Sequence, residues 1–203
     1  PAEGKASLFA ERERLGEAHA RQLEEVADLV PPEALTDNID ELKAAGKRVR
    51  LNPATAAYWF SKRLGDKCVS RGPDPCQRAK AIKNATEIKG TRAAHHRDGV
   101  AVCRFLAWFD REAPSGRLDE IRAARQLEAF RAETGKLKEI SFDTIAGSGP
   151  NGAIVHYRVN TESNRRIGRG ELFLVDSGAQ YGDGTTDVTR TIAIGRPKPE
   201  MRT

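Results

Sequence analysis

The sequence has no long hydrophobic run. No stretch approaches the roughly 18 apolar residues that a membrane-spanning helix requires, so we expect no membrane partner. Cysteine is also scarce, with three residues at irregular spacing. An odd, widely spaced set argues against both a disulfide framework and a zinc site. It favours the reducing cytoplasm as the location of the protein.

Blocks of five or six like charges are missing as well. The net charge of +5 could indicate a polyanionic partner, but acidic residues are interspersed among the basic ones, as in Glu11–Arg14. A solvated surface of mixed charge explains this pattern more simply than a nucleic-acid site. We therefore expect no nucleic-acid partner.

The composition that is present fits a folded chain. Of the 203 residues, 38% are hydrophobic and 31% are charged, a balance typical of a globular core. The sequence opens at Pro1 without a methionine, and residues 198–203 resemble the first turn of a new helix after a proline-rich turn. We expect the chain to be a fragment of a longer protein.

Residues 1–75 alternate helical and strand-like patterns, which is typical of an α/β domain. An amphipathic helix is predicted first, because apolar residues recur at helical spacing. The predicted elements are a helix over 8–30, a helix over 35–46, a strand over 48–51, a helix over 54–64 and a strand at 68–69. Glycine and two prolines within 72–75 mark the clearest boundary. We interpret residues 1–75 as the end of an α/β domain.

Residues 76–203 place helices first and strands afterwards, the order typical of an α+β domain. Helical patterns cover 76–112, with a break expected near Gly90, and a further helix is expected after a capping Ser115. The predicted strands lie at 142–146, 153–157, 171–176 and 187–194.

Two aspartates stand at strand ends. Asp176 ends one predicted strand and Asp187 begins the next, so their side chains could face each other within roughly 5 Å. Two carboxylates that close repel unless a proton or a cation lies between them, and hard divalent cations prefer oxygen ligands. An aspartate at a strand end more often caps a turn. Spacing alone therefore leaves both interpretations open.

His156 is one of four histidines and follows a glycine-rich turn. It could be a half-buried structural side chain, or it could contact a substrate and move protons. A single histidine is not a constellation that decides between these roles.

Three segments, in one order along the chain, carry a family resemblance. Residues 174–191 (LVDSGAQYGDGTTDVTRT) closely resemble a signature of aminopeptidase P, the Xaa-Pro aminopeptidase branch of the pita-bread metallopeptidases of family M24. Residues 149–157 resemble the first histidine motif of that family, and residues 80–99 resemble its entry helices. The resemblance implies an α+β pita-bread catalytic domain, incomplete here and covering 76–203. Residues 1–75 would be the end of the preceding creatinase-like N-terminal domain.

The resemblance also implies a chemistry. Family members bind two divalent metal ions, usually Mn²⁺, with Zn²⁺ or Co²⁺ as alternatives, and Asp176 and Asp187 match two of the metal ligands. His156 matches the catalytic histidine that contacts the substrate near the scissile bond. Thr189 shares a strand face with Asp187 and is expected to support the ligands. The implied reaction is hydrolysis by a metal-bridging hydroxide, which releases the residue ahead of proline from peptides with proline at the second position.

The family's metal-binding histidine and its two glutamates have no match in this sequence. We expect them beyond Thr203, so this chain alone should be inactive and the activity should belong to the full-length parent. The alternative is a non-catalytic pita-bread binding module. That class typically loses metal ligands, and the retention of both aspartates counts against it. A homodimer remains open.

Overall fold

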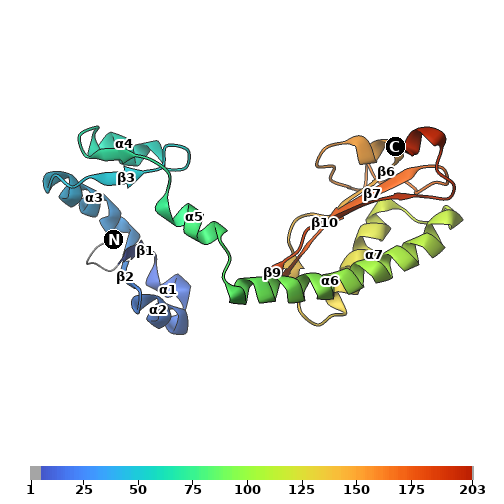
Figure 1. The fold of residues 1–203 in the computed structure, drawn as a ribbon, viewed down its shortest axis with the longest axis horizontal. Coiled ribbons are helices and arrows are strands. Elements are labelled where there is room, and N and C mark those ends of the chain that lie inside the picture. The colour runs from blue at the N-terminus through green and yellow to red at the C-terminus, as the bar shows by residue number, and fades with distance from the viewer. Residues whose placement is uncertain (1–5, 203) are drawn as a thin grey trace. The chain divides into compact units, whose positions relative to one another are not determined.

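The structure is a computed structural model that describes residues 6–202. The chain forms two compact units, Pro1–Ile82 and Lys83–Thr203, and each unit is described by itself (Figure 1). The sequence placed the division between residues 75 and 76. In the structure a short helix, α5, belongs to the first unit, and the division follows it. No helix within residues 6–202 is long and apolar enough to cross a membrane.

The first unit consists of short strands joined by helices. It has two sheets of two parallel strands each, β1 with β2 and β3 with β4. Parallel neighbours need a crossover connection, and helices supply it here; this order was predicted for the second sheet but not for the first. The elements are β1 Ala6–Phe9, α1 Arg12–Leu15, α2 Glu17–Glu24, β2 Ala27–Val30, α3 Leu35–Ala44, β3 Val49–Leu51, α4 Tyr58–Leu64, β4 Val69–Arg71 and α5 Pro75–Ala81.

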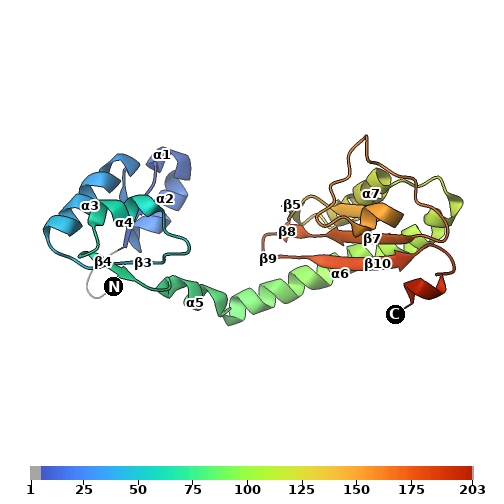
Figure 2. The same ribbon diagram turned by 90° about the horizontal axis from the view of Figure 1, so that it is seen from above.

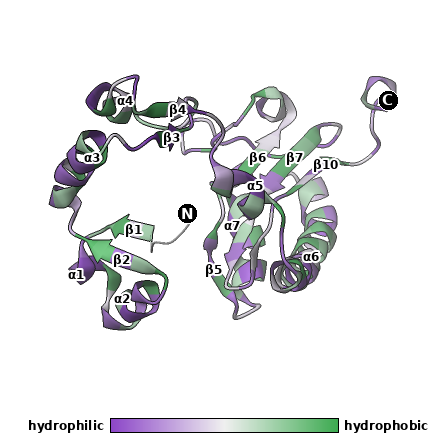
Figure 3. Ribbon diagram, turned by 60° about the vertical axis from the view of Figure 1, so that its left-hand side comes forward, coloured by the Kyte–Doolittle hydropathy of each residue, from purple (hydrophilic) through white to green (hydrophobic). Residues whose placement is uncertain are grey.

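The single helix predicted over 8–30 is wrong. Gly16 has a φ of 70°, a left-handed conformation that a right-handed helix does not contain, and it separates α1 from α2. The apolar residues at both ends belong to strands, since Leu8 pairs with Leu29 in the parallel register. Figure 3 shows β2 in hydrophobic colours and α2 in mainly hydrophilic ones. The apolar residues of two strands and of the helices between them thus happened to recur at helical spacing, which produced the wrong prediction.

Two helices form one layer of the second unit. They are α6, Ala85–Glu112, and α7, Glu120–Ala132, and they lie alongside each other in Figures 1 and 2. A capping box starts α6: Asn84 accepts from the Glu87 N–H, and the Glu87 carboxylate accepts from the Asn84 N–H. This reciprocal pair satisfies two donors that a helix start leaves free.

Two predicted helix features are wrong. The chain does not break near Gly90, where α6 is continuous. Glycine is required there because the carbonyl oxygen of Asp183 lies 2.3 Å from the position of a Cβ. Ser115 does not cap α7 either. Asp119 does, by accepting a hydrogen bond from the Arg122 N–H, while Ser115 ends a 3-10 turn before it.

The strands form two antiparallel sheets of three, with the orders β10-β7-β6 and β5-β8-β9. Helices first and antiparallel strands afterwards confirm the predicted α+β order. The strands are β5 Leu137–Ile140, β6 Ile145–Ser148, β7 Leu172–Ser177, β8 Ala179–Tyr181, β9 Gly184–Thr185 and β10 Val188–Ala193. Short 3-10 turns at Ala113–Ser115, Gly149–Ala153 and Pro199–Met201 complete the second unit.

The core of the second unit lies between its helices and the sheet β10-β7-β6. Phe105, Phe109, Leu127 and Phe173 belong to one buried cluster, and the rings of Phe109 and Phe173 stack with centroids 4.6 Å apart. Burying one large apolar side chain contributes about 1.5–3 kcal/mol. This packing fixes β7, which carries Asp176, against α6.

Candidate metal centre and the loop that carries His156

Asp176 lies on β7, the central strand of its sheet. Phe173 and Val175 point into the helical core and are buried, whereas Asp176 is half-buried. Because side chains alternate along a strand, Asp176 stands on the face away from the helices. Its Oδ1 accepts a hydrogen bond of 2.8 Å from the Thr189 hydroxyl.

Asp187 directly precedes β10 and is exposed. The register pairs Thr189 with Asp176 and Val188 with Ser177. Asp187 therefore does not stand opposite Asp176, which corrects the expectation of two directly facing carboxylates. Residues two apart share a strand face, so Asp187 falls on the diagonal from Asp176, where neighbours are about 7–8 Å apart.

A tight excursion through β8 and β9 sets that spacing. The backbone N–H of Thr186 donates to the carbonyl oxygen of Ala179, and the Thr186 hydroxyl accepts from the Ala179 N–H. Ser141 donates to the Thr186 carbonyl at 3.0 Å. A Cβ on Gly178 would lie 2.0 Å from that same carbonyl oxygen, so only glycine fits. These contacts hold the start of β10 beside the end of β7.

The two carboxylates suit a hard divalent cation, because such cations take carboxylate oxygens as ligands. Within residues 6–202 the Asp187 side chain has no hydrogen bond or ion pair, which leaves both its oxygens available. No group of three or more His, Cys, Asp or Glu side chains in that range could hold a metal ion. The donors present therefore fit a part of a metal site.

His156 lies in the segment that joins β6 to β7, after the 3-10 turn Gly149–Ala153. Its φ is 54°, in the left-handed region, which costs a non-glycine residue about 1–2 kcal/mol. The strand predicted over 153–157 is therefore wrong, because an extended strand cannot contain a positive φ at this position. The His156 side chain is exposed. Among the described residues it makes no hydrogen bond to Asp176 or Asp187.

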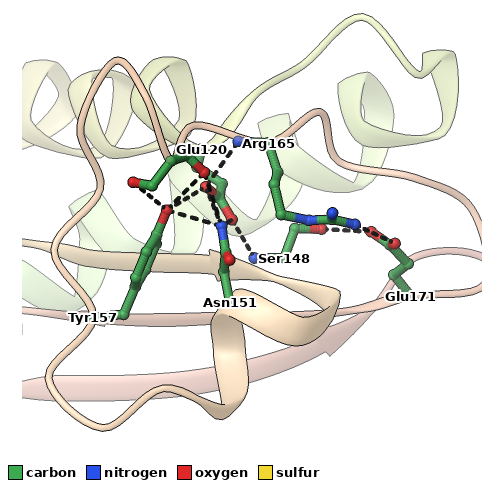
Figure 4. A network of polar contacts seen from close by, with 7 residues as sticks. Glu120, Ser148, Asn151, Tyr157, Arg165 and Glu171 are labelled. Carbon is green, nitrogen blue, oxygen red and sulfur yellow. Dashed lines mark hydrogen bonds and ion pairs between the residues drawn. The ribbon is translucent and has the colours of Figure 1, made fainter.

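A buried carboxylate braces that segment (Figure 4). Glu120, the first residue of α7, is 0% exposed. Its Oε1 accepts hydrogen bonds from the Ser148 N–H at 2.7 Å and from Asn151 Nδ2 at 3.0 Å. Its Oε2 accepts from the Tyr157 hydroxyl at 2.9 Å and from the Arg165 N–H at 3.0 Å. One side chain thus ties the end of β6 to three positions of the segment between β6 and β7.

Tyr157, the neighbour of His156, is 5% exposed. Burial raises the pKa of its hydroxyl; the Ser163 hydrogen bond lowers that pKa, and the Glu120 carboxylate raises it. The net shift is upward, so the hydroxyl stays a neutral donor. Sequence reasoning missed Glu120 and Tyr157 as a pair. The one available signal was a second acid directly after the helix-capping Asp119.

A second buried carboxylate lies between the two helices. Asp98 of α6 pairs with Arg131 of α7 through bonds of 2.7 and 3.0 Å, and both side chains are 0% exposed. The Tyr181 hydroxyl donates to Asp98 at 2.9 Å. Burial alone raises the pKa of Asp98. The hydrogen bonds and charge of Arg131 and the bond from Tyr181 outweigh burial, and the pKa lies below its usual value.

Comparison with known proteins assigns this architecture to a family. The model of metallopeptidase family M24 matches residues 89–203, and that of the creatinase/prolidase N-terminal domain matches residues 1–87. The chain belongs to metallopeptidase family M24. Its second unit is a part of the pita-bread domain of that family, as the sequence predicted.

The relatives extend well beyond this chain. A probable Xaa-Pro aminopeptidase P from Neurospora crassa is 37% identical over 209 residues, which cover 97% of this chain and 31% of the relative. The Xaa-Pro aminopeptidase ApepP of Drosophila melanogaster is 50% identical over 119 residues, 58% of this chain and 19% of the relative.

A solved structure of an enzyme with the same kind of name also matches this chain. An X-prolyl aminopeptidase from Caenorhabditis elegans, described as a cytosolic enzyme with a di-nuclear active site, superposes with a TM-score of 0.85 at 33% identity. The match covers 96% of this chain and 33% of that one. The match thus spans about a third of the length of the Neurospora crassa and Caenorhabditis elegans proteins.

Proposed function

We propose that the full-length protein containing this chain is a metal-dependent aminopeptidase that releases the N-terminal residue ahead of proline. The observation that carries the proposal is the pair Asp176 and Asp187 in a member of family M24: Asp176 lies on β7, and Asp187 directly precedes β10, the strand paired with β7. The relatives named as Xaa-Pro aminopeptidases support the substrate class. Peptides with proline at the second position are the proposed substrates.

Asp176 and Asp187 would hold the cations. The di-nuclear site of the Caenorhabditis elegans enzyme supports two ions, and we propose Mn²⁺, with Zn²⁺ and Co²⁺ as the alternatives. When bound, such ions polarise a peptide carbonyl and activate water for attack. Thr189 fixes Asp176 through its hydrogen bond to Oδ1. Groups that orient a metal ligand in this way sustain metal affinity.

His156 is the proposed proton carrier. Its imidazole is exposed, and an imidazole ring can both donate and accept a proton. We place it against the substrate near the scissile bond, where it would stabilise the developing charge or move a proton to the leaving amine.

The remaining ligands, one histidine and two glutamates, would come from the part of the parent after Thr203. Two carboxylates leave most coordination positions to water, so this chain alone should bind cations weakly and should not catalyse the reaction. The relatives named above are aminopeptidases, and they give the non-catalytic binding module no support.

The cytosolic Caenorhabditis elegans enzyme supports a cytoplasmic location for the parent, which we also propose. A homodimer is the simplest assembly that we propose for it. Light scattering on the full-length protein would read the oligomeric state, and fractionation of cells would read the location.

The function is tested with the full-length protein after its metals have been removed. Release of the first residue is measured with Mn²⁺, Zn²⁺, Co²⁺ or no metal, on a peptide with proline second and on a matched peptide with alanine second. We expect Mn²⁺ to restore release from the proline peptide alone. No release with any of the three metals would contradict the proposal. Equal release from both peptides would contradict the proline specificity.

A further inference from the structure

We propose that Glu120 is a positioning residue for His156: it holds the segment between β6 and β7 so that the histidine backbone keeps its left-handed conformation. The role in catalysis rests on the proposed function. Glu120 is 0% exposed, so it cannot touch a substrate and acts only through the residues that it binds.

The contacts of Glu120 are all with donors, which suits a carboxylate that only accepts. They are spread along one segment: Ser148 lies directly before it, and Asn151, Tyr157 and Arg165 lie within it. A loop of this length normally has several accessible conformations. Four hydrogen bonds to one buried side chain leave the described loop few alternative conformations.

The anchor reaches His156 through its neighbour. Tyr157 donates to Glu120 and accepts a hydrogen bond of 2.8 Å from Asn151 Nδ2, so the residue after His156 is fixed from two sides. The φ of 54° at His156 is a conformation that a free segment would relax. The Glu120 contacts supply the interactions that hold it.

A second brace closes the ends of the segment. Glu171 accepts from the Ser148 hydroxyl at 2.8 Å and pairs with Arg165 at 3.0 Å (Figure 4). A Cβ on Gly147 would lie 2.7 Å from the backbone nitrogen of Gly152, so the two backbone stretches pack too closely for any side chain at Gly147. The base of the segment is thus tightly closed, while His156 at its tip is exposed.

The substitution Glu120→Gln separates positioning from simple loss of volume. Whichever carboxylate oxygen becomes nitrogen, a backbone N–H loses its acceptor: that of Ser148 at the Oε1 position, or that of Arg165 at Oε2. The size of the side chain stays the same. Tyr157→Phe is the milder second variant, since it removes only the hydroxyl and keeps the buried ring.

Asp119→Ala is the matched control. Asp119 is the chain neighbour of Glu120, and its side chain caps α7 by accepting from the Arg122 N–H. Its loss weakens the same helix start without touching the anchors of the loop. A purely structural effect would therefore appear equally in both variants.

The activity of each variant is measured in the full-length, manganese-loaded protein. Glu120→Gln is measured both with His156 intact and combined with His156→Ala. We expect Glu120→Gln to lower kcat by up to about 100-fold, because a misplacement near 1 Å at a reacting group has that cost. Tyr157→Phe should have a smaller effect in the same direction. In the His156→Ala background, Glu120→Gln should cost little more, since residues acting through one another are not additive. Equal losses in both backgrounds, or a loss no larger than that of Asp119→Ala, would overturn the proposal.

Hydrogen exchange gives a readout that does not depend on activity. In full-length Glu120→Gln, amides of residues 149–165 should exchange faster than in the wild type while those of α6 do not change, because local opening is read by exchange. In Asp119→Ala that loop should exchange as in the wild type. If the wild-type enzyme shows no peptidase activity, the proposed function fails, and the exchange data still decide: an unchanged loop in Glu120→Gln would overturn the anchoring.

Discussion

The second unit holds carboxylates in two contrasting environments. Glu120 and Asp98 are fully buried, and donors from other elements surround each of them. Asp176 and Asp187 lie away from the helical core. Among the described residues, Asp176 accepts one side-chain hydrogen bond, from Thr189, and the Asp187 side chain accepts none. Buried carboxylates are stable only when hydrogen-bonded or paired. Two neighbouring carboxylates whose oxygens lack protein donors gain most from a shared cation.

The difference separates structural acids from acids available for chemistry. A carboxylate whose oxygens are occupied by protein donors holds elements together, and its loss should lower the free energy of unfolding. A carboxylate with free oxygens should matter little to folding and greatly to activity. Each prediction below tests one side of this contrast.

The largest effect is expected from the open pair. Asp187→Asn and Asp176→Asn should each lower the activity of the full-length protein by at least about 1000-fold, at or beyond the cost of removing one electrostatic stabiliser. The melting temperature without metal should hardly change, since surface substitutions usually alter stability by less than about 0.5 kcal/mol. Asp183→Asn, in the same excursion, is the control and should stay active. Retained activity in Asp187→Asn would contradict the claim that Asp187 serves the chemistry and not the fold.

The buried pair should behave in the opposite way. Asp98→Asn leaves the Arg131 charge uncompensated in the core, which should lower the free energy of unfolding by about 3–5 kcal/mol, measured by urea titration. Replacing both residues, Asp98→Leu with Arg131→Met, should cost much less. A double variant as unstable as the single one would contradict this explanation.

The same pair predicts a pH dependence of stability. The folded pKa of Asp98 lies below its usual value of 3.8, so the unfolded chain binds the proton more readily. The stabilisation is present above the unfolded pKa and is lost as the pH falls through the folded one. In Asp98→Asn, the fall in stability below about pH 4 should be shallower.

His156 should show an intermediate effect on activity alone. His156→Ala should lower kcat by roughly 100-fold, the lower range for losing a proton-transfer group, and leave metal content unchanged. The stability of His156→Ala should stay about equal, because alanine keeps the Cβ that strains the left-handed backbone and the lost ring is exposed. Lost metal binding would instead make His156 a ligand.

The smallest effect is expected at the hydrogen bond beside the open pair. Thr189→Val removes the donor to Asp176 and should weaken Mn²⁺ binding about tenfold, as for partners of metal ligands in general. Thr191→Val is the matched control, since Thr191 lies on the same strand face but pairs with Leu174. Equal binding by the two variants would show that the Thr189 bond does not orient the ligand.

Local patterns anticipated much of this fold. The strands around Asp176 follow from alternation and from turn residues, whereas the predicted capping residue Ser115 was wrong. Contacts between distant residues could not be predicted in this way. Gly90 was predicted to break the helix because the contact that requires glycine there, with the Asp183 carbonyl, lies 93 positions further along the chain. The first helix failed because the strand pairing of Leu8 with Leu29 is not visible in a local period.

The candidate site divides in the same way. The motif identified both aspartates, but their diagonal register depends on how the excursion between them folds. His156 was singled out by resemblance, and its predicted strand was wrong because Tyr157 turns inward to Glu120 while His156 has a positive φ. That acid belongs to a helix, 37 positions away. Only the folded chain brings such partners together.

The central claim, that Asp176 and Asp187 are metal ligands, is tested most directly by counting bound metal. Full-length wild type and the two Asn variants are dialysed against Mn²⁺ and assayed by elemental analysis. We expect two ions per wild-type chain, as in a di-nuclear enzyme, and clearly fewer in each variant. Two ions retained in both folded variants would contradict the claim.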